Sequence, residues 1–168
     1  MTGPSTTGTP SVFTSHSERP VADLTLAIAH HLLIFSLAGV LAFEIGAIRP
    51  GITSEDVVRL SRADRWYGVL AAAILLVGFT RAIFAAKGWA YYSANVFFMA
   101  KMGAFAVVGL LSIVPTVAIV RWRRASADNR AFSPALPKIR DIRRILWAEA
   151  TVFAFIPAFA AAMARGYG

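Results

Sequence analysis

The sequence predicts an all-α fold, an integral membrane four-helix bundle, from three observations. Hydrophobic residues make up 57% of the 168 residues and charged residues only 15%, whereas soluble domains contain about 25% charged residues. Four apolar runs are each long enough to cross a bilayer core of about 30 Å as one helix. These runs and their connections use nearly all of the chain, so we expect one domain over 23–168, with spans at about 24–48, 66–86, 95–120 and 145–163.

The segment before the first span is predicted to be a disordered polar tail. Residues 1–22 are rich in Ser, Thr, Gly and Pro and contain no apolar run. No charged segment leads into a short apolar one, so a cleavable signal peptide is not indicated. We therefore expect the run at 24–48 to remain in the mature protein as a membrane anchor.

Helix-breaking and helix-starting residues mark the ends of the predicted spans. The sequence Arg-Pro-Gly at 49–51 ends the first helix. The sequence Thr-Ser-Glu-Asp at 53–56 favours a helix start, and we expect a short surface helix there, before the second span. Pro115 and Pro157 lie inside the third and fourth spans, where proline predicts a bend.

Basic residues gather beside the spans, where they predict the orientation of the chain. In a soluble protein the net charge of +8 would suggest nucleic acid, but lysines and arginines that flank spans set membrane topology, so we expect no nucleic-acid partner. The loops after the first and third spans contain Arg49, Arg59, Arg62, Arg65, Arg121, Arg123, Arg124, Arg130, Lys138, Arg140, Arg143 and Arg144, and the opposite side has only Arg19, Arg81, Lys87 and Arg165. We therefore expect a multi-pass protein of the bacterial inner (cytoplasmic) membrane with both termini outside.

Ionisable side chains inside the spans form two predicted layers. Such groups are costly at membrane depth and mark candidate functional sites. The outer layer contains His30, His31, Arg81 and Lys101, and the layer near the cytoplasmic face contains Glu44, Arg65 and Glu149. Charges in the second layer can neutralise one another, whereas Lys101 has no span carboxylate at its depth. An unpaired lysine inside a span costs ~2.5 to 3.5 kcal/mol on insertion scales.

The outer layer combines the groups that a b-type haem requires, an imidazole for the iron and cations for the propionates. We expect His30 to be the iron ligand, with Lys101 and Arg81 as propionate partners and His31 as a further cofactor-binding candidate. Adjacent helical residues point about 100° apart, so the two histidines cannot both bind one iron. The sixth position is then empty or filled by methionine, lysine or another subunit. Candidates for the porphyrin walls are Phe35, Phe97, Phe98 and Phe105.

Two segments carry a resemblance to known families. These are Ala-His-His-Leu-Leu-Ile-Phe-Ser at 29–36 and Phe-Phe-Met-Ala-Lys at 97–101. The span region resembles an uncharacterised bacterial family of small four-helix predicted membrane proteins, and more distantly the HemJ-type protoporphyrinogen oxidases and CopD-like membrane proteins. HemJ proteins carry a haem-associated histidine followed six residues later by a small residue, matched here by His30 and Ser36, and a functional lysine, matched by Lys101. The resemblance implies a haem-type site at these positions.

The sequence also departs from HemJ proteins in both regions. Glu44 stands near the inner end of span one, where HemJ proteins have an arginine, and Val96 replaces their tryptophan five residues before the lysine. The histidine-rich end of span three is absent. We therefore transfer only His30 and Lys101 from that family.

The expected function is electron transfer or a membrane oxidoreduction at haem b, with the lipid bilayer as surroundings and a membrane redox partner or a second copy of the chain as candidate partners. The alternative is a cofactor-free accessory or scaffold protein, in which polar side chains only hold helices together. A small transporter or ion-responsive protein that uses the layer of Glu44, Arg65 and Glu149 is a third alternative, although no inverted repeat favours it. The sequence identifies no catalytic residue and leaves open whether the protein is an enzyme.

Overall fold

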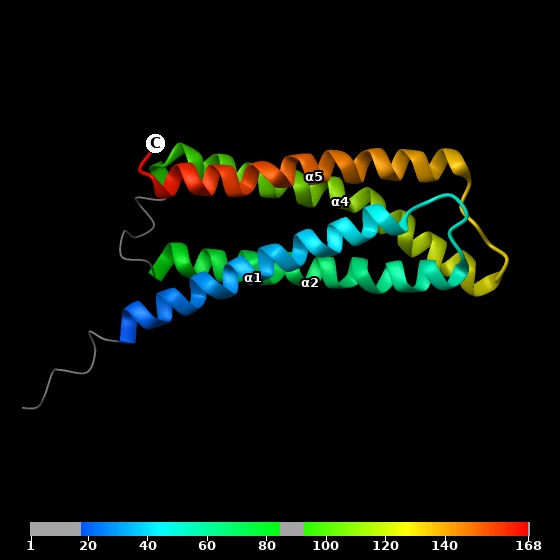
Figure 1. Cartoon of the computed structure of the whole chain (residues 1–168), viewed down its shortest axis with the longest axis horizontal. Helices are drawn as coiled ribbons and strands as arrows, with labels where there is room; N and C mark the ends of the chain where they lie inside the picture. The colour runs from blue at the N-terminus through cyan, green and yellow to red at the C-terminus, as the bar shows by residue number, and fades with distance from the viewer. Residues whose placement is uncertain (1–17, 85–92, 168) are drawn as a thin grey trace, which may run out of the picture.

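The computed structural model describes residues 18–84 and 93–167, which form long helices running up and down (Figure 1). The helices are α1 (Glu18–Ala47), α2 (Ser54–Phe84), α4 (Val96–Asp128) and α5 (Leu136–Ala164). Each is long and apolar enough to cross a membrane, and no strand occurs in the described ranges. The predicted fold class, an all-α integral membrane four-helix bundle, is confirmed.

The bundle consists of two helix pairs. α1 packs along α2 and α4 along α5, and the pairs meet where α2 contacts α4 and where α1 contacts α5. The start of α1 and the end of α5 lie at one end of the bundle, which we call the terminal end (Figure 1). Segments 48–53 and 129–135 connect the helices at the other end, the loop end. The chain therefore enters and leaves the bundle on the same side, as the alternation of four spans predicts.

The first two helices differ from the predicted boundaries. α1 begins at Glu18, so residues 18–22 are helical and do not belong to the tail; Pro20 is tolerated because it lies in the first turn. The rest of the predicted tail, and the predicted end of span two at residue 86, lie outside the described residues. The helix predicted to start at 53–56 does so, but it continues into the second span as α2. No glycine or proline separates the surface turn from the apolar run, so the helix does not break.

The cap of α2 explains why this helix starts where the sequence predicts. The Asp56 backbone N–H donates to Thr53 Oγ1 at 3.2 Å, and the Thr53 backbone N–H donates to Asp56 Oδ2 at 3.3 Å. This reciprocal pair satisfies two backbone donors that the first helical turn leaves free. At the start of α4, Asn95 accepts in the same way from the Phe98 backbone N–H at 3.0 Å.

The most completely buried apolar side chains gather toward the loop end. Those with at most 1% exposure include Ile48, Ile52, Val57, Leu60, Ile119, Ile139, Ile142 and Leu146. α4 and α5 also extend past the predicted spans here, because residues 121–128 and 136–144 continue the helices in charged sequence. The most completely buried part of the core therefore surrounds the two connections.

Polar contacts close the loop end as well. Arg143 on α5 donates from Nη1 to the carbonyl oxygens of Ile45 at 2.9 Å and Ile48 at 2.7 Å. The last carbonyls of a helix have no partner within that helix, so Arg143 satisfies the end of α1. Ser54 Oγ donates to the Arg130 carbonyl at 2.6 Å and links the two connections. This end is consequently held by both packing and hydrogen bonds.

Candidate functional site

His30 lies on α1 directly against α2. It is half-buried, and a Cβ built on Gly78 of α2 would lie 3.3 Å from His30 Cε1 and 3.9 Å from Nδ1. The imidazole therefore rests where α2 has no side chain. Its Nδ1 is buried and has no hydrogen-bond partner among the described residues. Within 18–84 and 93–167, His30 thus lacks through Nδ1 the interhelical hydrogen bond expected of a purely structural histidine in a membrane.

His31 differs from its neighbour in exposure and in bonding. Its side chain is exposed, and its Nδ1–H donates to the Ala27 carbonyl at 2.7 Å, one turn back along α1. The two rings stand at 89° with centroids 6.3 Å apart. The expected divergence of adjacent histidines is present, and the structure brings only His30 to the helix contact.

Lys101 and Arg81 accompany His30 from two other helices. Both are half-buried, and both lie close enough to act electrostatically on His30. Arg81 also acts on Lys101, whose Nζ lies 5.1 Å from the centroid of the Phe98 ring. The charges acting on His30 and Lys101 are all positive. We call His30, Arg81 and Lys101 the cationic group; sequence analysis predicted all three members.

The predicted aromatic walls divide between the inside and the outside of the bundle. Phe98 is buried, and Phe97 and Phe105 are half-buried. Phe35 is 72% exposed, so it does not face the interior of the bundle, and its role as a porphyrin wall stays a prediction. Its position five residues after His30 turns it by about 140° around α1, away from the helix contact.

A second set of polar residues lies deeper in the bundle. Glu44 on α1 and Glu149 on α5 are buried, with exposures of 3% and 1%. Tyr67 on α2 donates its hydroxyl hydrogen to Glu149 Oε1, and Thr116 on α4 donates to Asp64 Oδ1 at 2.6 Å. We call these five residues the acidic layer. It receives at least one side chain from every helix of the bundle.

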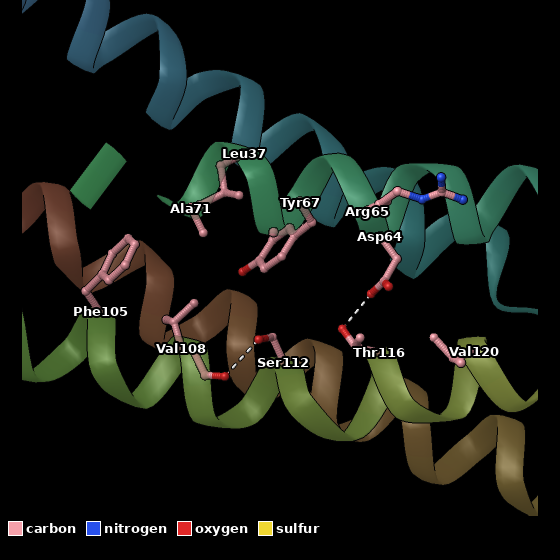
Figure 2. Close-up of a pocket in the computed structure, with 12 residues that line it drawn as sticks. Leu37, Asp64, Arg65, Tyr67, Ala71, Phe105, Val108, Ser112, Thr116 and Val120 are labelled. Carbon is pink, nitrogen blue, oxygen red and sulfur yellow. Dashed lines mark hydrogen bonds between the residues drawn. The ribbon is translucent and has the colours of Figure 1, made fainter. Parts of the chain in front are cut away.

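Arg65 does not belong to this layer, although the sequence placed it beside Glu44 and Glu149. Its side chain is exposed and extends away from the Asp64 carboxylate (Figure 2). No ion pair joins it to either glutamate in the part of the chain that the structure describes. Asp64 and Tyr67, three residues apart on one helix face, point inward instead. Sequence analysis missed both, although this i, i+3 spacing was visible.

A cavity of about 410 Å³ lies between α2 and α4 and reaches the acidic layer (Figure 2). Asp64, Tyr67 and Thr116 line its polar part, and Phe105 and Val108 are among its apolar walls. Arg65 and Ser112 line the cavity as well, so its polar groups are spread along an apolar hollow. A few polar groups among apolar walls are typical of small ligand sites.

The helices and their two ionisable layers define a multi-pass membrane protein. The chain belongs to the DUF2214 family, described as predicted membrane proteins, because the family model matches residues 22–168. This match covers most of α1 and all of the other three helices. It confirms the resemblance to a family of predicted membrane proteins. No curated protein and no solved structure matches the chain, so the more distant likeness to HemJ and CopD-like proteins stays a prediction.

Proposed function

We propose that the cationic group binds a b-type haem and that the protein uses it in electron transfer or another membrane oxidoreduction. The position of His30 carries this proposal. Its half-buried imidazole lies against the α2 backbone at Gly78 and keeps Nδ1 without a partner. A histidine placed in this way is available to a ligand inside the bundle, whereas His31 is exposed; the bond from its Nδ1 to the Ala27 carbonyl leaves its Nε2 available.

The chemistry of the cationic group supports a haem. An imidazole is a common axial ligand of haem iron, and two propionates favour cationic partners. Lys101 and Arg81 would hold the propionates, and they come from different helices, which would fix the orientation of the group. When bound, the haem would supply reversible one-electron chemistry at its iron. Half-buried Met102 and Met163, or a residue of a second copy, are candidates for the other axial position.

The membrane setting in this proposal follows from the basic residues. Most of the arginines lie in the connections at the loop end and on the helix ends beside them, so the positive-inside rule favours placing that end in the cytoplasm of a bacterial cell. The cationic group would then lie near the outer face of the inner membrane, where a membrane redox partner would exchange electrons with it.

A cofactor-free accessory or scaffold protein is the alternative. In that case His30, Arg81 and Lys101 would serve only to hold helices together. Intramembrane polar residues do so by bonding across helices. Nδ1 of His30 has no partner among the described residues, and the charges that act on this histidine are positive. Both observations favour ligand binding over a purely structural role.

The absorption spectrum of the detergent-purified chain tests the proposal. Protein expressed with ample haem should show a Soret band, and His30→Ala should lose it. His31→Ala is the matched control, because it removes an imidazole from the adjacent exposed position, and it should retain the band. A wild-type protein that stays colourless in the presence of haem, or a band that His30→Ala leaves unchanged, contradicts the proposal and favours the cofactor-free alternative.

A further inference from the structure

A groove between α4 and α5 combines cationic and apolar side chains. It has a volume of about 230 Å³. Its charged residues are Arg121 from α4 and Lys138 from α5, and no carboxylate from the described ranges lines it. The two cations can meet here because both helices continue beyond the predicted spans. The charge of the groove is therefore entirely positive among the described residues.

The two cations of the groove have no other partner in the part of the chain that the structure describes. Neither Arg121 nor Lys138 forms a hydrogen bond or an ion pair there, and both side chains are exposed. Neighbouring arginines differ: Arg143 donates to the carbonyls at the end of α1, and Arg144 pairs with Asp141. Membrane orientation requires basic residues beside the spans, but it does not require two of them to line one groove. Two unpaired cations at one place favour an anionic ligand with several acceptor oxygens.

The apolar part of the groove lies at membrane depth. Ile113, Val114 and Val117 line it, and their exposures are 53%, 44% and 42%. They precede Arg121 by up to eight residues, which is about 12 Å along α4. All three belong to the third predicted span, and Arg121 directly follows that span. Trp122 lines the groove beside Arg121, and tryptophan is enriched at the membrane interface. The groove therefore crosses from the level of the acyl chains to that of the headgroups.

We propose that this groove binds one anionic phospholipid of the bilayer. Arg121 and Lys138 hold its phosphate, and one acyl chain lies against the apolar residues of α4. Basic pockets between transmembrane helices bind anionic headgroups in this way. The positive headgroup of a zwitterionic phospholipid would be repelled by the same two cations. An acidic protein segment would not fill the apolar part, which faces lipid. The site is separate from the cationic group and does not depend on haem.

Native mass spectrometry of the detergent-purified full-length chain tests the site. The protein would be titrated with phosphatidylglycerol, which is anionic, and with phosphatidylcholine, which is zwitterionic. The wild type should retain one phosphatidylglycerol molecule more tightly than phosphatidylcholine. Arg121→Gln/Lys138→Gln should weaken phosphatidylglycerol binding about thirtyfold, because two basic contacts to an anionic headgroup are lost. Equal affinity of the wild type for the two lipids overturns the proposal.

A matched control separates the groove from the basic surface as a whole. Arg123→Gln/Arg140→Gln removes the same charge from the same two helices, at exposed positions that do not line the groove. This variant should retain most of the affinity for phosphatidylglycerol. An equal loss in the two double variants would mean that the basic surface attracts the lipid without a defined site, and it overturns the proposal. The Soret band should be the same in both variants and the wild type, so failure of the haem proposal and failure of this one are distinguishable.

Photo-crosslinking of the wild type needs no variant and remains decisive if the glutamine variants do not fold. The probe is phosphatidylglycerol with a photoreactive group in one acyl chain, and mass spectrometry of peptides locates the adduct. We expect the adduct within residues 113–117, and unlabelled phosphatidylglycerol should suppress it whereas phosphatidylcholine should not. Adducts spread evenly over all four helices, or an adduct that the two lipids suppress equally, contradict the proposal.

Discussion

The two halves of the bundle are built differently. Toward the loop end, apolar side chains such as Ile142 and Leu146 are fully buried and the acidic layer lies among them. Toward the terminal end, the members of the cationic group are only half-buried, and large apolar residues such as Leu24 and Phe155 are exposed. The half nearer the loops holds the fold together. The other half places ionisable groups at partly exposed positions.

The two halves of the bundle also differ in the sign of their ionisable groups. The two glutamates of the acidic layer are buried, and the charges acting on them are negative. The charges acting on His30 and Lys101 are positive, in keeping with the proposed anionic ligand. Groups of opposite charge therefore lie at two depths, and variants in each half should have different consequences.

The largest effect is expected at the loop end. Arg143→Ala removes two hydrogen bonds from a guanidinium to the final carbonyls of α1 and should lower the free energy of unfolding by about 3 kcal/mol. Arg144→Ala is the control on the next residue: its exposed ion pair with Asp141, at 3.9 Å, is worth less than about 1 kcal/mol. Denaturant unfolding in detergent measures both. Equal losses in the two variants would show that α1 does not depend on this contact.

Sequence analysis predicted the features that depend on position along a helix. Span length follows from hydrophobicity, and depth follows from a constant rise per residue, so the four helices and the depth of His30 and Lys101 could be predicted. The ends of the helices were harder to predict from the sequence. Charged residues at 121–128 and 136–144 suggested loops, yet arginine and alanine favour helix, and α4 and α5 include these segments.

Rotation about the helix axis was the part that sequence could not predict. In a membrane, apolar side chains cover both the packed and the lipid-facing sides of a helix, so no amphipathic pattern marks the inward face. For this reason the sequence predicts Arg65 in the layer of Glu44 and Glu149 and does not identify Asp64 and Tyr67. The same ambiguity leaves the direction of Phe35 open, and the structure shows it exposed.

An intermediate effect is expected within the acidic layer. Tyr67→Phe removes the hydrogen bond to Glu149 Oε1 and should destabilise the protein by about 2 kcal/mol, because a buried acceptor loses its donor. In a Glu149→Leu background the acceptor is absent, and the same substitution should have little effect. Tyr167→Phe, at an exposed position, is the neutral control. A loss of equal size in both backgrounds would mean that Tyr67 acts through packing and not through Glu149.

The smallest effect is expected where the cationic group meets α2. Replacing a helical glycine with alanine ordinarily stabilises a helix by about 1 kcal/mol. Gly68→Ala should show this gain, because a Cβ at that position meets nothing within 4 Å. Gly78→Ala should not show this gain in stability, because its Cβ would lie only 3.3 Å from His30 Cε1. The displaced imidazole should also weaken haem binding, measured by titration of the Soret band. If Gly78→Ala and Gly68→Ala bind haem equally well, the close approach of His30 to α2 plays no part in the site.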